Sequence, residues 1–505
     1  MSIQNDGGHP SDRPAVSISF SLKLPAQERR QGVKSQIALH KKSIEVLEKE
    51  HEELEKEREE LEKDLSLVVY PVLTLPVEIS SRIFLHCLPS HGRVTPSPTT
   101  APLLLVQICR HWREVALSTS RLWSSLYLYV GTILGRRTVP VDLQEQNLLR
   151  TWFARAKGSP LSLGLDIQCY EMASPALLDL VSSYASQIQH LDLHMQPEQF
   201  QKLRPFLTPF PLLQHLATIH SEDVQNLLIA SPLIREIRLL CDYKLDLLVD
   251  QSLPFLTHLE VNTITAEMFL AVLRNFPALS HLKCSYDPHS FSIPDASTPI
   301  TFPHLSSFHT NGSSLLRLVA FPNLCFLEIG YSAQRDVVQN FISRSSCTIR
   351  YLVIPFEPHN CWLGIFTSIS VLEVTECPEI ALWSLFGYLS SPTLLPRLTD
   401  ISIYSRSISS NIKSDCYDAL FKMLHHRRRR HPLRAAILRR FRIRISSINY
   451  GDNYSQIWRP GHLTTLALEQ LLEDGLDFGV CVLWKGVEIP LWPATYVLEP
   501  EPNFP

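Results

Sequence analysis

Histidines that recur at one position of a repeated pattern are the first candidates for chemistry. His190, His215, His258 and His281 each stand directly before a leucine in segments such as PLLQHLAT. Neighbouring strands of a sheet lie about 4.8 Å apart, so two such histidines could share a metal ion. A structural metal site needs three or four converging ligands, and the pattern supplies no such set. The chain also lacks the nucleophile-elbow, dinucleotide-binding, P-loop and zinc-protease motifs, so we predict no catalytic residue, no metal, no cofactor and no enzyme activity.

A basic run, HHRRRRHPLRAAILRRFRIRI at residues 425–445, is the second candidate and holds nine arginines. Clustered arginines can engage an import receptor or neutralise phosphates. Alternatively, they form the polar face of a last helix, followed by a strand from which Arg442 and Arg444 point outward. The net charge of −3 gives the chain no general attraction to nucleic acid or anionic membrane. Neither is therefore expected as a partner, and nuclear import stays open.

An internal repeat of the form P-x-L-x-x-L-x-φ, where φ is apolar, would position these side chains. Ten copies begin at residues 186, 211, 232, 254, 277, 303, 322, 347, 367 and 396. This spacing fits one strand and one helix per copy and resembles the leucine-rich repeat. Stacked copies bury a continuous core that no single copy could form. We therefore predict an uneven α/β (or α+β) solenoid over residues 127–445, capped by a tail at residues 446–505.

Two columns of side chains should lie on the open face of this sheet, because alternate residues of a strand point to opposite faces. The first column runs His190, His215, Glu236, His258, His281, Ser307, Phe326, Tyr351, Val371 and Asp400. The second runs Asp192, Ala217, Arg238, Glu260, Lys283, His309, Glu328, Val353, Glu373 and Ser402.

An exposed apolar and aromatic patch is expected where these columns contain Phe326, Tyr351, Val353 and Val371. Aromatic side chains ringed by polar groups are typical of binding hot spots. We interpret these four residues, with His258 and His281, as candidates for binding a target protein. The alternative is that the C-terminal tail folds back and covers the patch as a cap.

A compact apolar block precedes the repeats, at residues 71–126. The segment LTLPVEISSRIFLHCLP predicts a short helix with apolar side chains on two faces. After the loop SHGRVTPSPTT, residues 90–100, the segment LLLVQICRHW is apolar on almost every side. A block of about fifty-five residues cannot bury that much apolar surface by itself. We therefore expect a partner protein to cover part of it.

The same block resembles an F-box, and the motifs occur in order. They are Leu75-Pro76-x-Glu78-Ile79, Arg82-Ile83-Phe84, Val106-x-x-Cys109-Arg110-x-Trp112-Arg113-x-Val115-Ala116 and Leu122-Trp123. In that family a three-helix motif docks on a Skp-type adaptor, which hangs from a cullin in a ubiquitin ligase. The resemblance implies adaptor contacts from Leu75, Pro76, Ile79, Ile83, Phe84, Val106, Cys109 and Trp112. The loop at residues 90–100 is longer than the link usual in the family.

A charged heptad segment at residues 34–70 predicts a long helix. Leu47, Leu54 and Leu61 occupy successive d positions, while His51 and Arg58 occupy a positions. The leucine stripe either packs on its own domain or forms a dimer, and the polar a positions argue for weak or no self-association. Residues 1–33 show no periodicity and are expected to be disordered. A heptad segment before the block and the phrase RTWFARAKGSPLSLGLDI after it resemble the large F-box families of basidiomycete fungi.

Together these resemblances imply a non-catalytic substrate-recognition subunit of a Skp–cullin–F-box ubiquitin ligase. The alternative is an interaction scaffold whose F-box acts outside ubiquitin transfer. The 11 cysteines are scattered without a C-x-x-C pair, which indicates a reducing compartment rather than a disulfide framework. No signal-peptide core or membrane-spanning run is present, so a cytoplasmic or nuclear location, or both, is expected.

Overall fold

The computed structural model describes residues 26–67, 71–89, 92–130, 141–167, 175–195, 209–219, 224–240, 248, 253–286, 298–330, 333–356, 361–391, 393–405, 414–429, 436–445, 462–484 and 487–492. The chain divides into two compact units, Met1–Ser80 and Ser81–Pro505. Among the described residues, no helix combines the length and the apolar character needed to cross a membrane.

The first unit is dominated by α1 (Ala26–Leu67), followed by a 3₁₀ turn, η1 (Pro71–Thr74), and the start of α2 (Val77–His86). The predicted long helix is confirmed. It begins at Ala26, so the predicted disorder is wrong for residues 26–33, and residues 1–25 lie outside the described part. Good helix formers before Val33, such as Gln27, Glu28 and Arg29, account for the earlier start. The leucine stripe is exposed rather than packed within this unit.

The second unit opens with a small helical element. It comprises the end of α2, then α3 (Leu105–Ile108), α4 (Arg110–Ser118) and the 3₁₀ turn η2 (Ser120–Trp123). Cys109 has extended backbone angles, so it separates α3 from α4, and its Sγ accepts the N–H of Trp112 at 3.4 Å. The rings of Phe84 and Trp112 lie 5.0 Å apart, and the Trp123 Nε1 donates to the Ala116 carbonyl at 2.9 Å. These contacts join the helices to the core of the whole unit.

The remainder of the unit is an α/β structure built on one long sheet of 15 strands. In spatial order the strands are β1 (Ser125–Val130), β2 (Leu161–Ile167), β3 (Ile188–Met195), β4 (His215–Thr218), β5 (Glu236–Leu239), β6 (His258–Ile264), β7 (His281–Tyr286), β9 (Ser307–Thr310), β11 (Phe326–Ile329), β12 (Tyr351–Pro355), β13 (Val371–Thr375), β14 (Asp400–Ser405), β15 (Arg440–Ile445), β16 (Asp477–Trp484) and β17 (Val487–Trp492). Neighbours pair in parallel except β16 and β17, which pair antiparallel. A separate pair, β8 (Ile300–Thr301) and β10 (Val319–Ala320), is also parallel.

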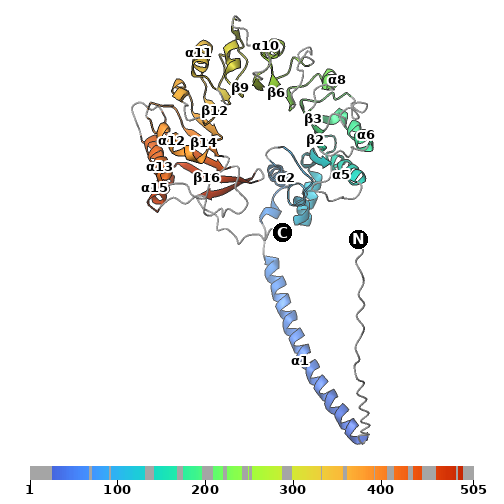
Figure 1. The fold of residues 1–505 in the computed structure, drawn as a ribbon. Helices are drawn as coiled ribbons and strands as arrows, with labels where there is room; N and C mark the ends of the chain where they lie inside the picture. Colours follow the sequence, from blue (N-terminus) through green and yellow to red (C-terminus); the bar gives the residue numbers. More distant parts are fainter. Residues whose placement is uncertain are drawn as a thin grey trace, which may run out of the picture. The chain divides into compact units, whose positions relative to one another are not determined.

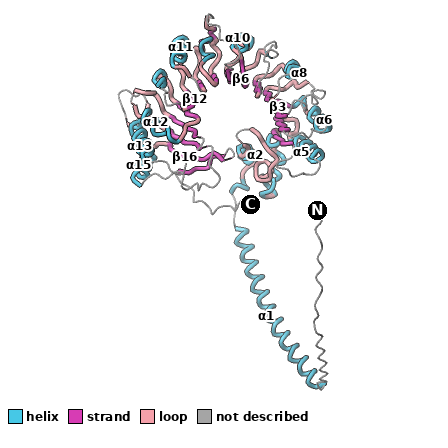
Figure 2. Tube along the Cα trace, in the orientation of Figure 1, coloured by secondary structure: helices cyan, strands magenta, loops and turns pink. Residues whose placement is uncertain are grey.

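Helices alternate with the strands and lie on the outer side of the curved sheet, while the strands line its inner side (Figures 1 and 2). The described helices are α5 (Val141–Arg155), α6 (Pro175–Ser183), α8 (Val224–Ile229), α10 (Ala266–Asn275), α11 (Arg335–Ser345), α12 (Glu379–Leu389), α13 (Ser414–Arg428) and α15 (His462–Glu473). Short 3₁₀ turns replace or accompany helices at η3 (Ala185–Gln187), η5 (Ser314–Leu318) and η6 (Cys361–Ile365). The predicted solenoid-like arrangement of strands and helices is thus present. In the tail, α15 and β16 continue this arrangement, and β17 ends the sheet as an antiparallel strand.

The strand register confirms the predicted columns along their whole length. Each residue of the first column pairs with the next one, from His190 through to Asp400, and the second column pairs in the same way from Asp192 to Ser402. Between the columns runs a row of apolar residues from Leu191 to Ile401, each only 0–2% exposed. Burying one such side chain stabilises the fold by roughly 1.5–3 kcal/mol. This row fixes the register, because a slip of one residue would expose it.

The long loop after α2 covers the free edge of the sheet at β1. The Tyr127 N–H donates to the Val94 carbonyl at 2.7 Å, and the Ser125 hydroxyl donates to the Gly92 carbonyl at 2.9 Å. Arg93, from the same loop, donates to Asp192 at 3.1 Å. An uncovered edge strand invites pairing with other chains. The loop therefore has a structural role at the start of the sheet, which accounts for its length.

Candidate functional site

The small helical element exposes large apolar side chains. Ile83 on α2, Leu104 just before α3 and Ile108 on α3 are 41–52% exposed. Earlier on α2, in the first unit, Val77 and Ile79 are also exposed. Several large apolar side chains exposed on one small helical element favour an interaction with a partner. The second unit thus offers a partner at least the α2–α3 surface, defined here as Ile83, Leu104 and Ile108.

The eight residues predicted to contact an adaptor divide by burial. Pro76, Ile79 and Ile83 are exposed. Four are half-buried: Leu75, Val106, Cys109 and Trp112. Phe84 is only 1% exposed, so the prediction that it faces a partner is wrong. It packs under Trp112 because the i, i+4 spacing that exposes Ile79 and Ile83 turns it toward the core.

Two exposed residues escaped the sequence analysis, Leu104 and Ile108. The apolar segment LLLVQIC gave no way to choose between its sides, because the break at Cys109 ends α3 after one turn. The motif residues that follow stabilise this break between α3 and α4. Cys109 caps α4, and Arg113 Nε donates to the Val106 carbonyl of α3 at 2.7 Å. The Cys-Arg-x-Trp-Arg segment therefore shapes the element, while the residues before it provide the exposed apolar surface.

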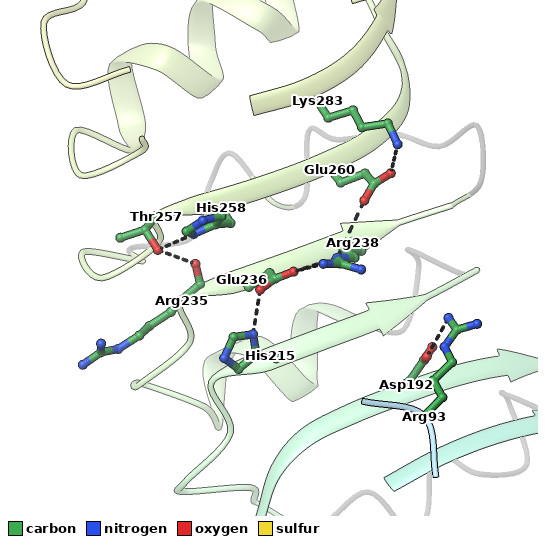
Figure 3. A network of polar contacts seen from close by, with 10 residues as sticks. All are labelled: Arg93, Asp192, His215, Arg235, Glu236, Arg238, Thr257, His258, Glu260 and Lys283. Atoms are coloured by element: carbon green, nitrogen blue, oxygen red, sulfur yellow. Dashed lines mark hydrogen bonds and ion pairs between the residues drawn. The ribbon is translucent and has the colours of Figure 1, made fainter. Parts of the chain in front are cut away.

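The second candidate site is the open face of the sheet, whose first half carries a chain of polar contacts (Figure 3). His190 and His215 stack with ring centres 4.0 Å apart, and His215 Nδ1 lies 2.7 Å from Glu236 Oε2. Arg238 lies between two carboxylates, 2.6 Å from Glu236 and 3.7 Å from Glu260. Negatively and positively charged side chains thus alternate along the sheet. They hold one another in place and give the network no net charge.

Glu260 also pairs with Lys283 at 2.6 Å, which extends the network to β7. In the other column, His258 and His281 stack at 4.0 Å, and each ring is held by a hydroxyl, from Thr257 at 2.9 Å and Ser280 at 2.8 Å. Both histidines are half-buried on the open face, where the sequence placed them. The face is therefore pre-ordered across β3 to β7.

Protonation of this network is set mainly by burial. Burial, then the nearby His215, lowers the pKa of His190 to about 4. Burial also lowers the pKa of both His258 and His281. The hydrogen bond from His215 lowers the pKa of Glu236 to about 2. Near neutral pH His190, His258 and His281 are thus mostly uncharged while Glu236 is ionised.

Metal binding finds no support in this geometry. The imidazoles stack face to face in pairs, an arrangement that turns ring nitrogens outward rather than toward a common point. In the part of the chain that the structure describes, no group of three His, Cys, Asp or Glu side chains could hold a metal ion.

The second half of the open face holds an aromatic stack. The Phe326 ring lies 4.5 Å from the His309 ring and 4.7 Å from the Tyr351 ring, centre to centre. His309 Nδ1 lies 2.6 Å from Glu328, and the Tyr351 hydroxyl donates to Glu373 at 2.7 Å. The contacts of His309 and Tyr351 with these glutamates hold the stack at both ends. The edges of its rings therefore present a fixed surface.

The predicted apolar patch is smaller than expected. Phe326, Tyr351 and Val371 are half-buried on the open face, but Val353 is only 6% exposed. Its register neighbours are Glu328 and Glu373, whose longer side chains flank the short valine. Val353 is therefore removed from the candidate binding residues. The alternative that the C-terminal tail covers the patch depends on residues 446–461 and 493–505, which lie outside the described part.

Part of the basic run is used inside the fold, and residues 430–435 lie outside the described part. Arg427 is only 2% exposed and donates to three backbone carbonyls, those of Leu389, Leu394 and Leu395, at 2.7–3.0 Å. Arg440 pairs with Asp477 at 3.2 Å, and Arg442 also contacts this carboxylate. These contacts favour the structural interpretation of the run, with Arg442 on the open face as predicted. Nothing in the sequence pattern distinguished Arg427 from its neighbours.

Comparison with known proteins adds little. No family model matches the chain, and no curated protein matches it. A solved structure of a Bacteroides fragilis protein aligns with 46% of this chain and 73% of that chain, at 13% identity and a TM-score of 0.30. A likeness at this level supports no conclusion about this chain.

Proposed function

We propose that this chain is a non-catalytic substrate-recognition subunit of a Skp–cullin–F-box ubiquitin ligase, with leucine-rich-repeat-like units as its target-binding part. The helical element would dock on a Skp-type adaptor, and the open face of the sheet would bind the target protein. The observation that carries the proposal is the α2–α3 surface: large apolar side chains left in water by an element whose other side is buried.

The adaptor half of the proposal rests on how this element divides its apolar residues. Phe84, Val115, Leu122 and Trp123 are buried in the core that continues into the sheet. Ile83 and Ile108 remain exposed, although other apolar side chains of the same element are buried in this core. Exposing large apolar groups costs free energy that a protein interface recovers, at roughly 25 cal/mol per Å² removed from water. An adaptor with an apolar surface fits this pattern and the F-box resemblance.

The target half rests on pre-ordering of the open face. Stacked rings and charged rungs already hold each other, so a target would not have to order them on binding. The face offers two chemically different halves, a charged, histidine-rich one and an aromatic one around Phe326 and Tyr351. Aromatic anchors beside satisfied polar groups are the composition of protein-binding hot spots.

The mechanism would be proximity. Holding a target near a ubiquitin-charged enzyme raises its effective concentration there, and this requires no catalytic group from the present chain. Specificity would come from the open face, and the connection to the ligase from the α2–α3 surface.

Adaptor binding tests the first half. In an Ile83→Asp/Ile108→Asp variant, two carboxylates would have to be buried in an apolar interface, so we expect affinity for a Skp-type adaptor to fall about 100-fold or more. The control is Ile229→Asp, which places the same charge on an exposed apolar position of α8. Calorimetry with the full chain measures the affinities, and the thermal midpoint confirms folding. Unchanged affinity in the double variant would refute the docking surface. Recovery of the adaptor without a cullin from cells would instead support the interaction scaffold.

Target capture tests the second half. A Phe326→Ala/Tyr351→Ala variant should keep the adaptor and lose the proteins that the wild type co-purifies from cells. Phe255→Ala, which removes an exposed ring before β6, serves as the control. If the double variant co-purifies the same proteins as the wild type, the aromatic stack is packing and not a binding site.

A further inference from the structure

Helix α1 presents an apolar stripe to solvent that His40, His51 and Arg58 interrupt. Val33, Ile37, Ile44, Leu47, Leu54 and Leu61 occupy a and d positions of one heptad pattern, and all are 52–61% exposed. With 42 residues, the helix is about 63 Å long. An exposed stripe of two residues per heptad on a helix has the form of one half of a coiled coil.

A parallel pairing of two copies would be poor. It would place Arg58 against Arg58 of the second copy and His51 against His51 in the seam. It would also align Glu50 with Glu55 of the second copy, because parallel coiled coils pair g positions with the following e positions. The expectation of weak or no self-association rests on His51 and Arg58 at these seam positions.

An antiparallel pairing removes the contacts of Arg58 and His51 with themselves. It leaves two like-charged pairs near its centre, Glu48 with Glu48 and Glu50 with Glu50 of the second copy. It places a positions opposite d positions, so Ile37 would meet Leu61 of the second copy and Ile44 would meet Leu54, each pair occurring twice. Because the helix starts at Ala26, Ile37 lies well inside it and can provide these layers. In the same register Arg58 lies opposite His40 rather than opposite itself. The opposed helix dipoles also favour this direction.

Charges on the helix flank agree with the antiparallel direction. The e positions are basic in the first half of α1, at Lys34 and Lys41, and acidic in the second half, at Glu55 and Glu62. Antiparallel pairing brings e positions of the two copies together, Lys34 with Glu62 and Lys41 with Glu55. Within one helix, Arg58 already lies 3.6 Å from Glu55 and 3.1 Å from Glu62. Its charged end is thereby held at the flank while its aliphatic stem lies along the seam.

We propose that α1 binds the α1 of a second copy of this chain as an antiparallel two-stranded coiled coil centred near Lys49. This pairing is independent of the proposed ligase function. It would join two chains through their N-terminal helices.

Charge reversals in the full chain distinguish the two directions. Glu55→Lys/Glu62→Lys puts like charges together in the antiparallel dimer but opposite charges together in a parallel one. We therefore expect dissociation to become about tenfold or more easier, from several flank pairs each worth a few tenths of a kcal/mol. Lys34→Glu/Lys41→Glu should weaken the dimer similarly, and combining both reversals should restore it. The matched control, Glu52→Lys/Glu59→Lys, changes the same charges at outward b positions and should leave dissociation unchanged.

Sedimentation equilibrium at micromolar concentration measures the association of the 57.6 kDa chain, and circular dichroism confirms that each variant keeps its helix. A wild type that stays monomeric overturns the proposal. Tighter association of the Glu55→Lys/Glu62→Lys variant means a parallel dimer and also overturns it. A dimer that ignores all the reversals, or that the control weakens equally, shows that another surface is responsible.

Discussion

Arg427 provides the sharpest test of how the last repeats are held together. Its guanidinium is buried, and its Nε, Nη1 and Nη2 donate to the carbonyls of Leu389, Leu395 and Leu394 at 2.7, 3.0 and 2.8 Å. Leu389 is the last residue of α12, so its carbonyl has no partner within the helix. Arg427→Met keeps most of the stem and removes all three donors.

The expected loss in free energy of unfolding is about 3–5 kcal/mol. Hydrogen bonds to a charged donor are each worth about 1.5–3 kcal/mol, and the carbonyls left behind would be buried without them. The guanidinium's own desolvation cost, which also disappears, reduces the sum to the range found when one partner of a buried charged contact is removed. Arg427→Lys should lose less, because an ammonium still donates but cannot reach three carbonyls.

Urea unfolding of the full chain, followed by tryptophan fluorescence and circular dichroism, measures this loss. The control is Arg439→Met, an exposed arginine of the same basic run. If both variants lose the same small amount, the buried contacts have been misjudged and the reasoning fails. The comparison also bears on nuclear import: substitutions meant to test import should use the exposed Arg429 and Arg439, since changing Arg427 would destabilise the fold as well.

Three further changes have defined outcomes. Trp112→Ala should cost about 2–3 kcal/mol, less than a fully buried tryptophan, because the ring is half-buried, and urea unfolding checks it. Gly164→Ala should lower the thermal midpoint, since its Cβ would overlap the Tyr127 ring and force it to move at a cost of about 1–3 kcal/mol; an unchanged midpoint would show that the ring yields freely. The pKa of Glu236 falls from 4.5 to about 2 on folding, so its ionised form stabilises the fold fully above pH 4.5, and this contribution is lost as pH falls toward 2. The loss is up to about 3 kcal/mol; Glu236→Gln should therefore unfold with a weaker acid dependence than the wild type, and identical acid profiles would mean that His215 does not hold it.

The repeat register was predictable because burial repeats with the period of a strand. In each strand, apolar residues alternate with outward-facing ones, so one face of the sheet is buried in the core. This alternation alone places His258 beside His281 and Phe326 beside Tyr351. The exposure of an outward residue was less predictable. Val353 lies on the expected face but is hidden by the longer side chains beside it, which a column of letters does not reveal.

Features that depend on tertiary contacts were out of reach. The sequence does not distinguish Arg427 from the other arginines of its run. Its role depends on carbonyls at the end of α12, which only the folded chain brings near it. The break at Cys109 decides which side of LLLVQIC stays in water, and its cue is a backbone conformation rather than a composition. The start of α1 at Ala26 was missed because no large apolar residue lies between Ala26 and Val33, although Gln27, Glu28 and Arg29 are good helix formers.

The joint between the helical element and the sheet has a geometric consequence. The Trp123 and Trp152 rings lie 4.9 Å apart, the Arg155 guanidinium lies over Trp123 at 4.4 Å, and Trp152 Nε1 donates to the Ser125 carbonyl at 3.0 Å. A joint packed in this way resists bending, so the helical element and the sheet should move together as one rigid body. Under the proposed ligase function, a target held on this rigid body would lie at a fixed distance and angle from the ubiquitin donor. Which lysines of the target are modified would then be decided by distance rather than by sequence. A few residues inserted after Trp123 should move the modified lysines without weakening capture of the target.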